Sequence, residues 1–150
     1  MHELRKVMTA EDWAALHSIR RATLFAPGRH ADEIVYDDHH PDDRNPANQC
    51  FLLTYGGRPI GVVRLDPRGD KDGVVRLVAV VPDQQRRGHG RAMSELIDAE
   101  ARRRGMNKLL INAHGSAVGF YERTGWAPET WDPGELLGIA AHCTQMTKRL

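Results

Sequence analysis

The sequence predicts an α/β domain of the α+β type, with helices on both faces of a mixed, mostly antiparallel central sheet of about seven strands. Short apolar runs alternate with longer amphipathic segments along the chain. Gly56-Gly57 separates two apolar runs, and because both glycines can adopt a positive φ, the pair predicts a hairpin and antiparallel strands. After residue 73 the order strand, helix, strand, helix requires at least one parallel pair.

Apolar patterning sets the expected elements. The expected strands are 4–8, 50–55, 60–65, 74–81, 108–113, 126–131 and 139–148. The run 74–81 is almost unbroken in its apolar character, so we expect a central strand covered on both faces, ended by Pro82. The expected helices start at Thr9, with Asp12 completing a capping box, and at residues 90 and 116. We expect residues 29–48 to form an irregular segment that can include a short helix at 31–36. Pro41 and Pro46 predict a loop beyond that helix.

Bulk composition limits the class of protein. The 150 residues predict a single domain, 1–150, and a hydrophobic share of 41% is ordinary for a globular chain. A net charge of +1 argues against a nucleic-acid-binding protein, and no apolar window is long enough to span a membrane. The two cysteines predict reduced, buried thiols in a cytoplasmic protein. Adjacent histidines rarely converge on one ion, so His39-His40-Pro41-Asp42-Asp43 is not taken as a metal site, and no metal is expected.

The segment most informative about chemistry follows the apolar run 74–81. A glycine-rich and arginine-rich loop opens directly into the helix that starts at residue 90. The first amides of a helix lack internal acceptors and carry partial positive charge, which makes them an anion site. Gly88 and Gly90 allow close approach of a phosphate, and Arg86, Arg87 and Arg91 add positive charge. A turn with solvated arginines is the alternative; the chain contains no nucleotide P-loop motif.

The same loop carries a family resemblance. Gln85-x-x-Gly88-x-Gly90 resembles the Q/R-x-x-G-x-G/A signature of the Gcn5-related N-acetyltransferase (GNAT) superfamily. Two further blocks are similar to that family, one from Asn112 to Trp126 and one from Gly138 to Lys148. The three blocks together cover residues 50 to 150, whereas the first 48 residues match only in their strand–helix layout.

The resemblance implies an acyl-CoA N-acyltransferase fold and acetyl-CoA as cosubstrate, with no metal. The glycine loop would bind the diphosphate of coenzyme A through its amides, and the preceding strand would pair with the pantetheine arm where it splays from its neighbour. The residues expected to bind the cofactor are Val78, Val80, Gln85, Arg86, Arg87, Gly88, His89, Gly90 and Arg91.

The expected catalytic residues are Tyr121, His142 and Asn112. Tyr121 aligns with the tyrosine that this family places near the coenzyme sulfur, so it is expected to act as the acid for the thiolate. Some relatives use a glutamate on the central strand as base, but Arg76 is the charged residue there and is expected to pair with a carboxylate. His142 is therefore a candidate base, acting directly or through a water, and the alternative is a half-buried strand histidine with a structural partner. Asn112 either orients pantetheine or a water, or caps its strand.

The resemblance leads to one principal prediction of function. The chain is expected to transfer acetyl from acetyl-CoA to a primary amine of a small molecule or peptide, by direct attack in a ternary complex. The acidic segment within residues 29–48 is expected to border the acceptor pocket, with an ordinary polar surface as the alternative. Because an acidic base is missing, an inactive acyl-CoA sensor of the same fold is a second hypothesis, and a nucleotide-binding protein of another fold is a third. Assembly as a homodimer is left open.

Overall fold

A computed structural model describes residues 1–29 and 34–150. Its main elements, in chain order, are β1 (His2–Lys6), α1 (Ala10–Ala22), α2 (Pro41–Arg44), β2 (Gln49–Tyr55), β3 (Arg58–Arg68), β4 (Asp72–Val80), α3 (His89–Arg103), β5 (Lys108–Ala113), α4 (Val118–Arg123), β6 (Ala127–Pro128) and β7 (Thr144–Arg149). Short 3-10 turns lie at Pro82–Gln84, Gly115–Ala117, Pro133–Glu135 and Gly138–Ala140. None of the described helices is long and apolar enough to cross a membrane.

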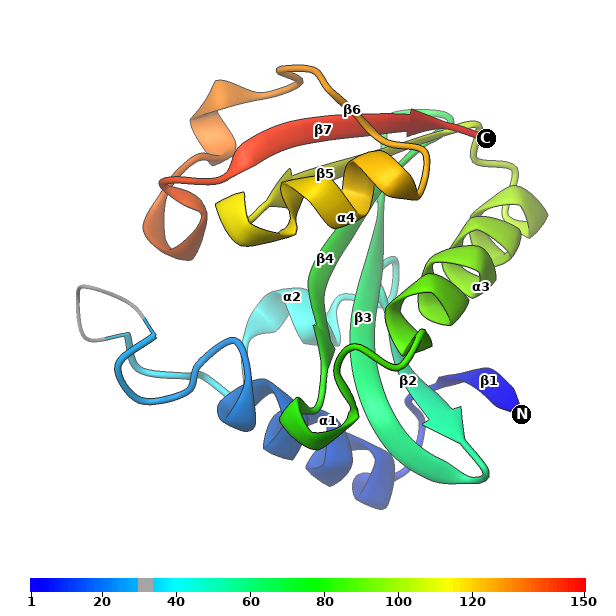
Figure 1. Ribbon diagram of the computed structural model, residues 1–150, viewed down its shortest axis with the longest axis vertical. Coiled ribbons are helices and arrows are strands. Elements are labelled where there is room, and N and C mark those ends of the chain that lie inside the picture. Colours follow the sequence, from blue (N-terminus) through cyan, green and yellow to red (C-terminus); the bar gives the residue numbers. More distant parts are fainter. Residues whose placement is uncertain (30–33) are drawn as a thin grey trace.

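The seven strands form a single sheet, ordered β1-β2-β3-β4-β5-β7-β6 (Figure 1). β4 and β5 pair in parallel, and the other five neighbouring pairs are antiparallel. This confirms the predicted mixed, mostly antiparallel sheet. Gly56 and Gly57 have φ values of +58° and +81°, so the predicted hairpin between β2 and β3 is also confirmed.

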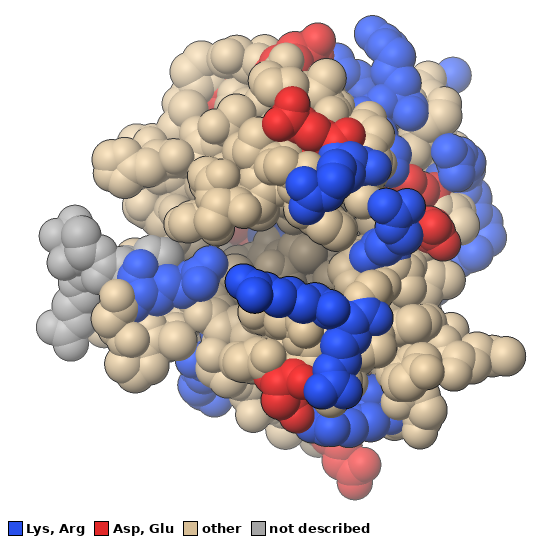
Figure 2. All heavy atoms as spheres, in the orientation of Figure 1, with Lys and Arg blue, Asp and Glu red and all other residues tan. Residues whose placement is uncertain are grey.

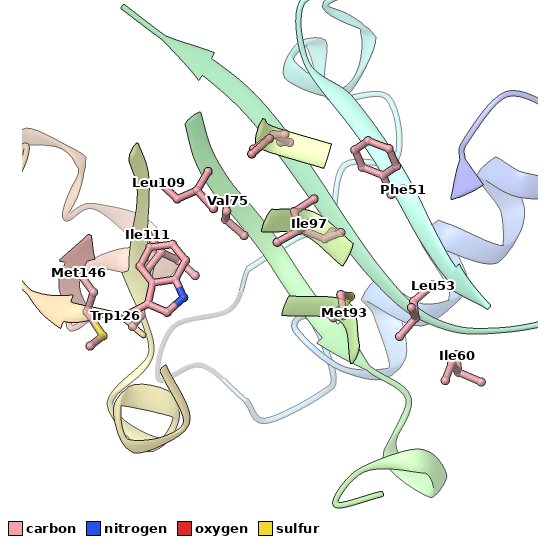
Figure 3. Close-up of a cluster of buried hydrophobic side chains, with 14 residues drawn as sticks. Phe51, Leu53, Ile60, Val75, Met93, Ile97, Leu109, Ile111, Trp126 and Met146 are labelled. Atoms are coloured by element: carbon pink, nitrogen blue, oxygen red, sulfur yellow. The ribbon is translucent and has the colours of Figure 1, made fainter. Parts of the chain in front are cut away.

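Helices cover both faces of the sheet because successive side chains of a strand point in opposite directions. Phe51 and Leu53 of β2 pack in a cluster with Met93 and Ile97 of α3 (Figure 3). The alternate residues of β2 pack with α1 in a second cluster; that cluster contains Val7, Leu16, Ile19, Cys50, Leu52, Val62 and Ala79. Val75 of β4 belongs to the first cluster and Ala79 to the second, so the predicted central strand lies between two layers.

Local signals fix the helix ends. Thr9 caps α1 by accepting from the Asp12 amide, while the Asp12 carboxylate accepts from the Thr9 amide, which is the predicted capping box. Gly88, with a φ of +82°, precedes α3, and Gly105, with a φ of +81°, follows it.

Two expectations about secondary structure were wrong, and a third lies partly outside the described residues. The expected strands 126–131 and 139–148 shrink to β6 (Ala127–Pro128) and β7 (Thr144–Arg149), because 3-10 turns occupy much of the segment between them. Pro41 starts the short helix α2 rather than continuing a loop, since proline is well suited to a first helical position. The expected short helix at 31–36 lies partly outside the described residues, and 34–36 form neither helix nor strand.

Candidate active site

The end of the loop and the start of α3, from Arg86 to Arg91, present a row of free amides. Among the described residues, the N–H groups of Arg86 through Arg91 donate to no internal acceptor, and the first amide of this stretch to do so is Ala92, bonded to the Gly88 carbonyl at 3.2 Å. Arg86 and Gly88 both have positive φ, 63° and 82°, which turns successive amides toward one side. A Cβ built on Gly88 meets nothing within 4 Å, so the space in front of the loop is open. This geometry suits an anion.

The side chains of the loop divide into two groups. Arg86, Arg87 and Arg91 are exposed around the free amides, where a bound anion would meet their charges. Gln85 donates from Nε2 to the Val80 carbonyl at 2.9 Å and so ties the loop to the end of β4. His89 differs from expectation, because its side chain is only 5% exposed. Only its amide is available to a ligand.

The buried His89 ring joins the start of α3 to the N-terminal strand. Its Nδ1 lies 2.7 Å from His2 Nε2, and its Nε2 lies 3.2 Å from Gln84 Oε1. The ring also lies 5.1 Å from the ring of Tyr55. The helix start that carries the free amides is thus anchored to β1, β2 and the preceding 3-10 turn.

β4 and β5 separate where the predicted pantetheine slot should begin. They pair only from Asp72↔Lys108 to Val75↔Ile111, whereas β4 stays paired with β3 as far as Val80 (Figure 1). Leu77, with a φ of +55°, lies at the register shift between β3 and β4 and turns β4 away from β5. The Val81 amide donates to the Ile60 carbonyl of β3. Because the main-chain groups of successive residues point to opposite sides of a strand, those of Val80 point to the side from which β5 has separated. Val78 shares that orientation two residues earlier.

A cavity of about 520 Å³ lies at this opening. Its walls combine the separated strands (Val75 to Val78, Ile111, Asn112), the segment around α4 (Tyr121), the α1–α2 region (Arg20, Tyr36, Asp42) and the turn before β7 (Ile139, Cys143). Figure 2 shows the molecule hollowed between its upper and lower parts, with Lys and Arg side chains at the border of the hollow. The unpaired edge of β4 therefore borders this cavity at Arg76 to Val78, and the loop with the free amides follows β4 along the chain.

Comparison with known proteins assigns the family. Residues 13–126, three quarters of the chain, match the model of the Acetyltransferase (GNAT) family. The chain belongs to the GNAT family. A curated relative, the chloroplastic serotonin N-acetyltransferase 2 of Oryza sativa subsp. japonica, is 36% identical over 84 residues. That match covers 56% of this chain and 40% of the relative, so the chain spans less than half of the relative it matches.

Solved GNAT structures share the fold at low identity. The ribosomal-protein-S18-alanine N-acetyltransferase of Escherichia coli is 21% identical with a TM-score of 0.74, covering 99% of this chain and 94% of that one. The PaiA N-acetyltransferase of Thermoplasma acidophilum, solved with coenzyme A, is 14% identical with a TM-score of 0.75, covering 100% and 99%. At such identities the likeness shows the GNAT fold alone.

Tyr121 of this GNAT domain lines the cavity from α4. Its ring packs edge-on against Phe120 and Trp126, at centroid distances of 5.4 and 5.7 Å. Burial, and to a lesser degree the nearby Cys143 thiol, raises the pKa of the phenol well above its usual range. The hydroxyl therefore keeps its proton throughout the neutral and moderately alkaline range and can donate a hydrogen bond into the cavity.

The other two expected catalytic residues have different surroundings. Asn112 lines the cavity, but its amide donates to Glu135 at 3.2 Å and its carbonyl accepts from Gln145 at 2.9 Å. His142 was expected on a strand, and this was wrong: it is exposed in the turn before β7 and is absent from the cavity lining. The 3-10 turn ending at Ala140 shifts the start of β7 beyond it.

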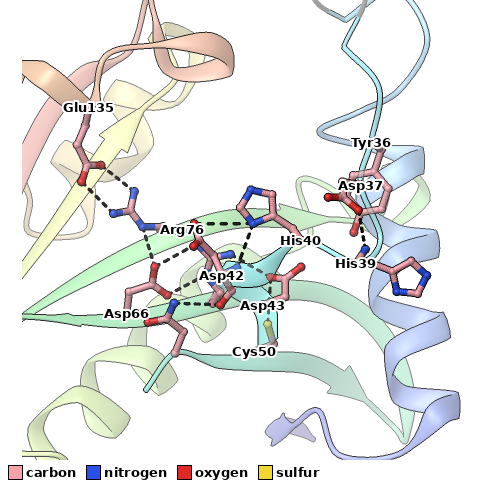
Figure 4. A network of polar contacts seen from close by, with 12 residues as sticks. Tyr36, Asp37, His39, His40, Asp42, Asp43, Cys50, Asp66, Arg76 and Glu135 are labelled. Carbon is pink, nitrogen blue, oxygen red and sulfur yellow. Dashed lines mark hydrogen bonds and ion pairs between the residues drawn. The ribbon is translucent and has the colours of Figure 1, made fainter. Parts of the chain in front are cut away.

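A chain of charged groups runs beside the cavity (Figure 4). Asp43 accepts from Arg20 at 2.7 and 3.1 Å and from Arg64 at 2.9 Å. Arg64 binds Asp66 through two bonds, and Asp66 accepts from Arg76 at 2.9 Å. In turn Arg76 binds Glu135 through both Nη atoms, at 2.8 and 3.0 Å. The predicted carboxylate pairing of Arg76 is confirmed, and three guanidinium groups balance three carboxylates.

These pairings change which groups remain reactive. The hydrogen bonds from Arg76 lower the pKa of Glu135, and those from Arg20 and Arg64 outweigh burial to lower the pKa of Asp43. Neither carboxylate is therefore a ready proton acceptor near neutral pH. Asp37 and Asp42 also line the cavity and are exposed, with Asp42 no closer than 4.0 Å to Arg64. The described part of the acidic segment thus borders the cavity, while Asp32 and Glu33 lie outside the described residues.

Sequence reasoning missed the carboxylates of this chain and the amide of Gln145. Asp43, Asp66 and Glu135 come from separate segments, and the contacts that join them to arginines span between 2 and 67 positions. No local pattern marks such partners. Of the described residues, no group of three or more His, Cys, Asp or Glu side chains is arranged to hold a metal ion.

Proposed function

We propose that this protein transfers acetyl from acetyl-CoA to a primary amine, by direct attack within a ternary complex. The single observation that carries the proposal is the separation of β4 from β5: it leaves an unpaired strand edge beside the cavity that Tyr121 lines, and the free amides before α3 follow that edge along the chain. Coenzyme A has a diphosphate, an extended amide-bearing arm and a terminal thioester in the matching order. Each part then meets a surface with suitable chemistry.

Coenzyme A binding is assigned to the residues that shape this path. The amides of Arg86 to Arg91 hold the diphosphate, with the guanidinium groups of Arg86, Arg87 and Arg91 as counter-charges. The main chain of Val78 and the amide of Val80 pair with the pantetheine arm as an added strand would, while the Val80 carbonyl accepts from Gln85. Gln85 keeps the end of β4 and the loop together, so that both parts of the cofactor are bound in one conformation.

The chemistry requires a neutral amine. Solvent at the opening of the cavity can accept the proton that the ammonium form of the acceptor loses. The amine nitrogen attacks the thioester carbonyl, forming a C–N bond and a tetrahedral oxyanion. Collapse breaks the C–S bond, nitrogen loses a proton and sulfur gains one, which yields the amide and free coenzyme A. The pKa of Tyr121 is raised and lies above that of a thiol, so the phenol stays protonated. We assign it to donating a hydrogen bond to the departing sulfur while the proton lost by the nitrogen reaches that sulfur.

The acceptor side is the part of the cavity opposite the β4–β5 opening. Asp37 and Asp42 border it with exposed carboxylates, which favours the approach of a cationic amine. The relatives named above include a serotonin N-acetyltransferase and an alanine N-acetyltransferase of ribosomal protein S18, so small-molecule and peptide amines are both within the proposal. A cytoplasmic location and a homodimer remain predictions.

Turnover tests the proposal directly. Purified protein with acetyl-CoA is incubated with tryptamine, spermidine, lysine and a hexapeptide starting with alanine, and released thiol is measured. Amine-dependent release that falls about 10- to 100-fold in Tyr121→Phe, with the Kd for coenzyme A unchanged, supports the enzyme. The absence of a carboxylate base on β4, where Arg76 stands, favours the sensor as second candidate. Tight acetyl-CoA binding without release for any amine would establish that candidate instead.

A further inference from the structure

The segment between β6 and β7 forms one wall of the cavity without being part of the sheet. It supplies Ile139, Ala140 and Cys143 to the lining. Its regular structure is limited to two 3-10 turns, Pro133–Glu135 and Gly138–Ala140. Such a segment has few main-chain bonds to its surroundings, so other contacts must hold the wall in place.

Side chains from four strands converge on the start of this segment. Arg76 of β4 gives Glu135 two bonds, while Asn112 of β5 and Arg68 of β3 donate to the same carboxylate at 3.2 and 3.4 Å. Gln145 of β7 accepts from the amides of Trp131 and Asp132, both at 2.9 Å. Glu135 is thus the group of the segment that β3, β4 and β5 hold together, while Gln145 of β7 holds Trp131 and Asp132.

Arg76 supplies the two shortest bonds that Glu135 accepts, and its place in the sheet explains why a side chain is needed. Val75 is the last residue of β4 paired with β5, so Arg76 is the first beyond the separation. From here on the main chain facing β5 has no strand partner, and it remains available for a ligand. A long, two-pronged side chain can cross the opening and hold the far wall without using those main-chain groups.

Arg76 is also held rigidly itself. Its Nε donates to Asp66, and Asp66 is fixed by two bonds from the buried Arg64. The Arg76 side chain is 27% exposed and that of Glu135 20%, so this pair is better shielded from water than a typical surface ion pair. Three fixed donors leave the guanidinium a single orientation.

We propose that Arg76 is a positioning residue for the acceptor site: through Glu135 it holds residues 131–143 against the separated strands and so fixes the wall beside Tyr121. This inference rests on the proposed function for its catalytic consequence. Where some relatives are expected to carry a glutamate base on this strand, this chain carries a cation that organises the acceptor wall. Loss of the tether should loosen that wall and leave the coenzyme A loop unaffected.

The two cysteines provide a direct test. Cys143 lies at the end of the segment and is half-buried, whereas Cys50 is 2% exposed and burial raises its pKa to about 12. Labelling with a disulfide reagent therefore reports opening of the wall at Cys143 and opening of the whole fold at Cys50. We expect Arg76→Gln and Glu135→Gln to speed Cys143 labelling at least about tenfold with Cys50 unchanged, and Arg76→Lys to fall between them and wild type.

A matched control comes from α3. Arg104 is 28% exposed and donates to Glu100 at 3.0 Å, a similar ion pair away from the cavity. Arg104→Gln should leave Cys143 labelling as in wild type. Three labelling results would each overturn the tether. They are equal acceleration of Cys143 and Cys50 labelling, acceleration of Cys143 labelling by Arg104→Gln to the same degree, and no acceleration by Arg76→Gln.

Kinetics and calorimetry separate this inference from the proposed function. With the panel amine that wild type turns over fastest, Arg76→Gln should raise the amine KM at least about fivefold while the Kd for coenzyme A stays within twofold. An equal loss of coenzyme A affinity would contradict the positioning role. If wild type bound no coenzyme A, the proposed function would fail, and thiol labelling would still decide whether Arg76 holds the wall.

Discussion

The pair Asp42 and Asp43 allows a sharp test of the charged chain, because two adjacent aspartates of α2 differ in burial. The Asp43 side chain is 4% exposed and accepts three bonds from Arg20 and Arg64, which are themselves 1% and 5% exposed. The Asp42 side chain is 59% exposed and 4.0 Å from its nearest arginine. Substitution of each by asparagine keeps the shape and removes one charge.

Asp43→Asn leaves two buried guanidinium groups short of a counter-charge. Removing one partner of a buried pair destabilises a protein by about 3–5 kcal/mol, whereas an exposed pair contributes about 0–1 kcal/mol. We therefore expect Asp43→Asn to lower the free energy of unfolding by about 3 kcal/mol or more and the Tm by about 10 °C. Asp42→Asn should change the free energy of unfolding by less than about 0.5 kcal/mol.

Urea denaturation followed by circular dichroism measures both values, and its pH dependence has a defined sign. The arginines hold the pKa of Asp43 below its unfolded value, so its stabilising contribution is full above about pH 4 and is lost as pH falls through the native pKa. The difference between wild type and Asp43→Asn should shrink below about pH 4. Equal stabilities of the two variants at pH 7 would refute the reasoning.

Three further predictions concern the cofactor loop and the cavity. Gly88→Val should weaken coenzyme A binding at least about tenfold by calorimetry, whereas Gly105→Val, at a matching φ on the far end of α3, should strain the fold without that loss. Gly90→Ala places a Cβ 3.2 Å from the Phe120 ring and should destabilise the fold by about 1–2 kcal/mol, a loss that Phe120→Leu partly reverses in denaturation experiments. Because the pKa of Tyr121 is raised, kcat/KM should rise with pH as the amine deprotonates and show no fall below about pH 10; an earlier decline would contradict the assigned phenol.

Local sequence patterns predicted the parts of the fold that local forces decide. Gly56-Gly57, the capping box of Thr9 and the loop before α3 each depend on residues within a few positions of one another. The loop was also the part of the candidate site that could be found from sequence, because its chemistry resides in consecutive amides.

Contacts between residues far apart in the sequence could not be predicted in this way. Arg76 and Glu135 are 59 positions apart, and no sequence pattern near residue 135 indicates that the two side chains pair. His142 was misplaced because an apolar run ending in a strand was extended backward through a 3-10 turn. The positive φ of Leu77, which turns β4 away from β5, is a property of the assembled sheet and not of leucine.

The parallel pairing of β4 with β5 has a consequence for how this architecture tolerates divergence. Two parallel neighbours need a long return connection, and here that connection is α3 with the loop preceding it. Because α3 follows β4 after this loop, its N-terminus lies near the end of β4 where the two strands separate. The free amides and the opening between the strands are thus placed together by chain connectivity rather than by particular side chains. Chains that share only about a fifth of their residues can therefore keep this arrangement of elements as part of the common fold.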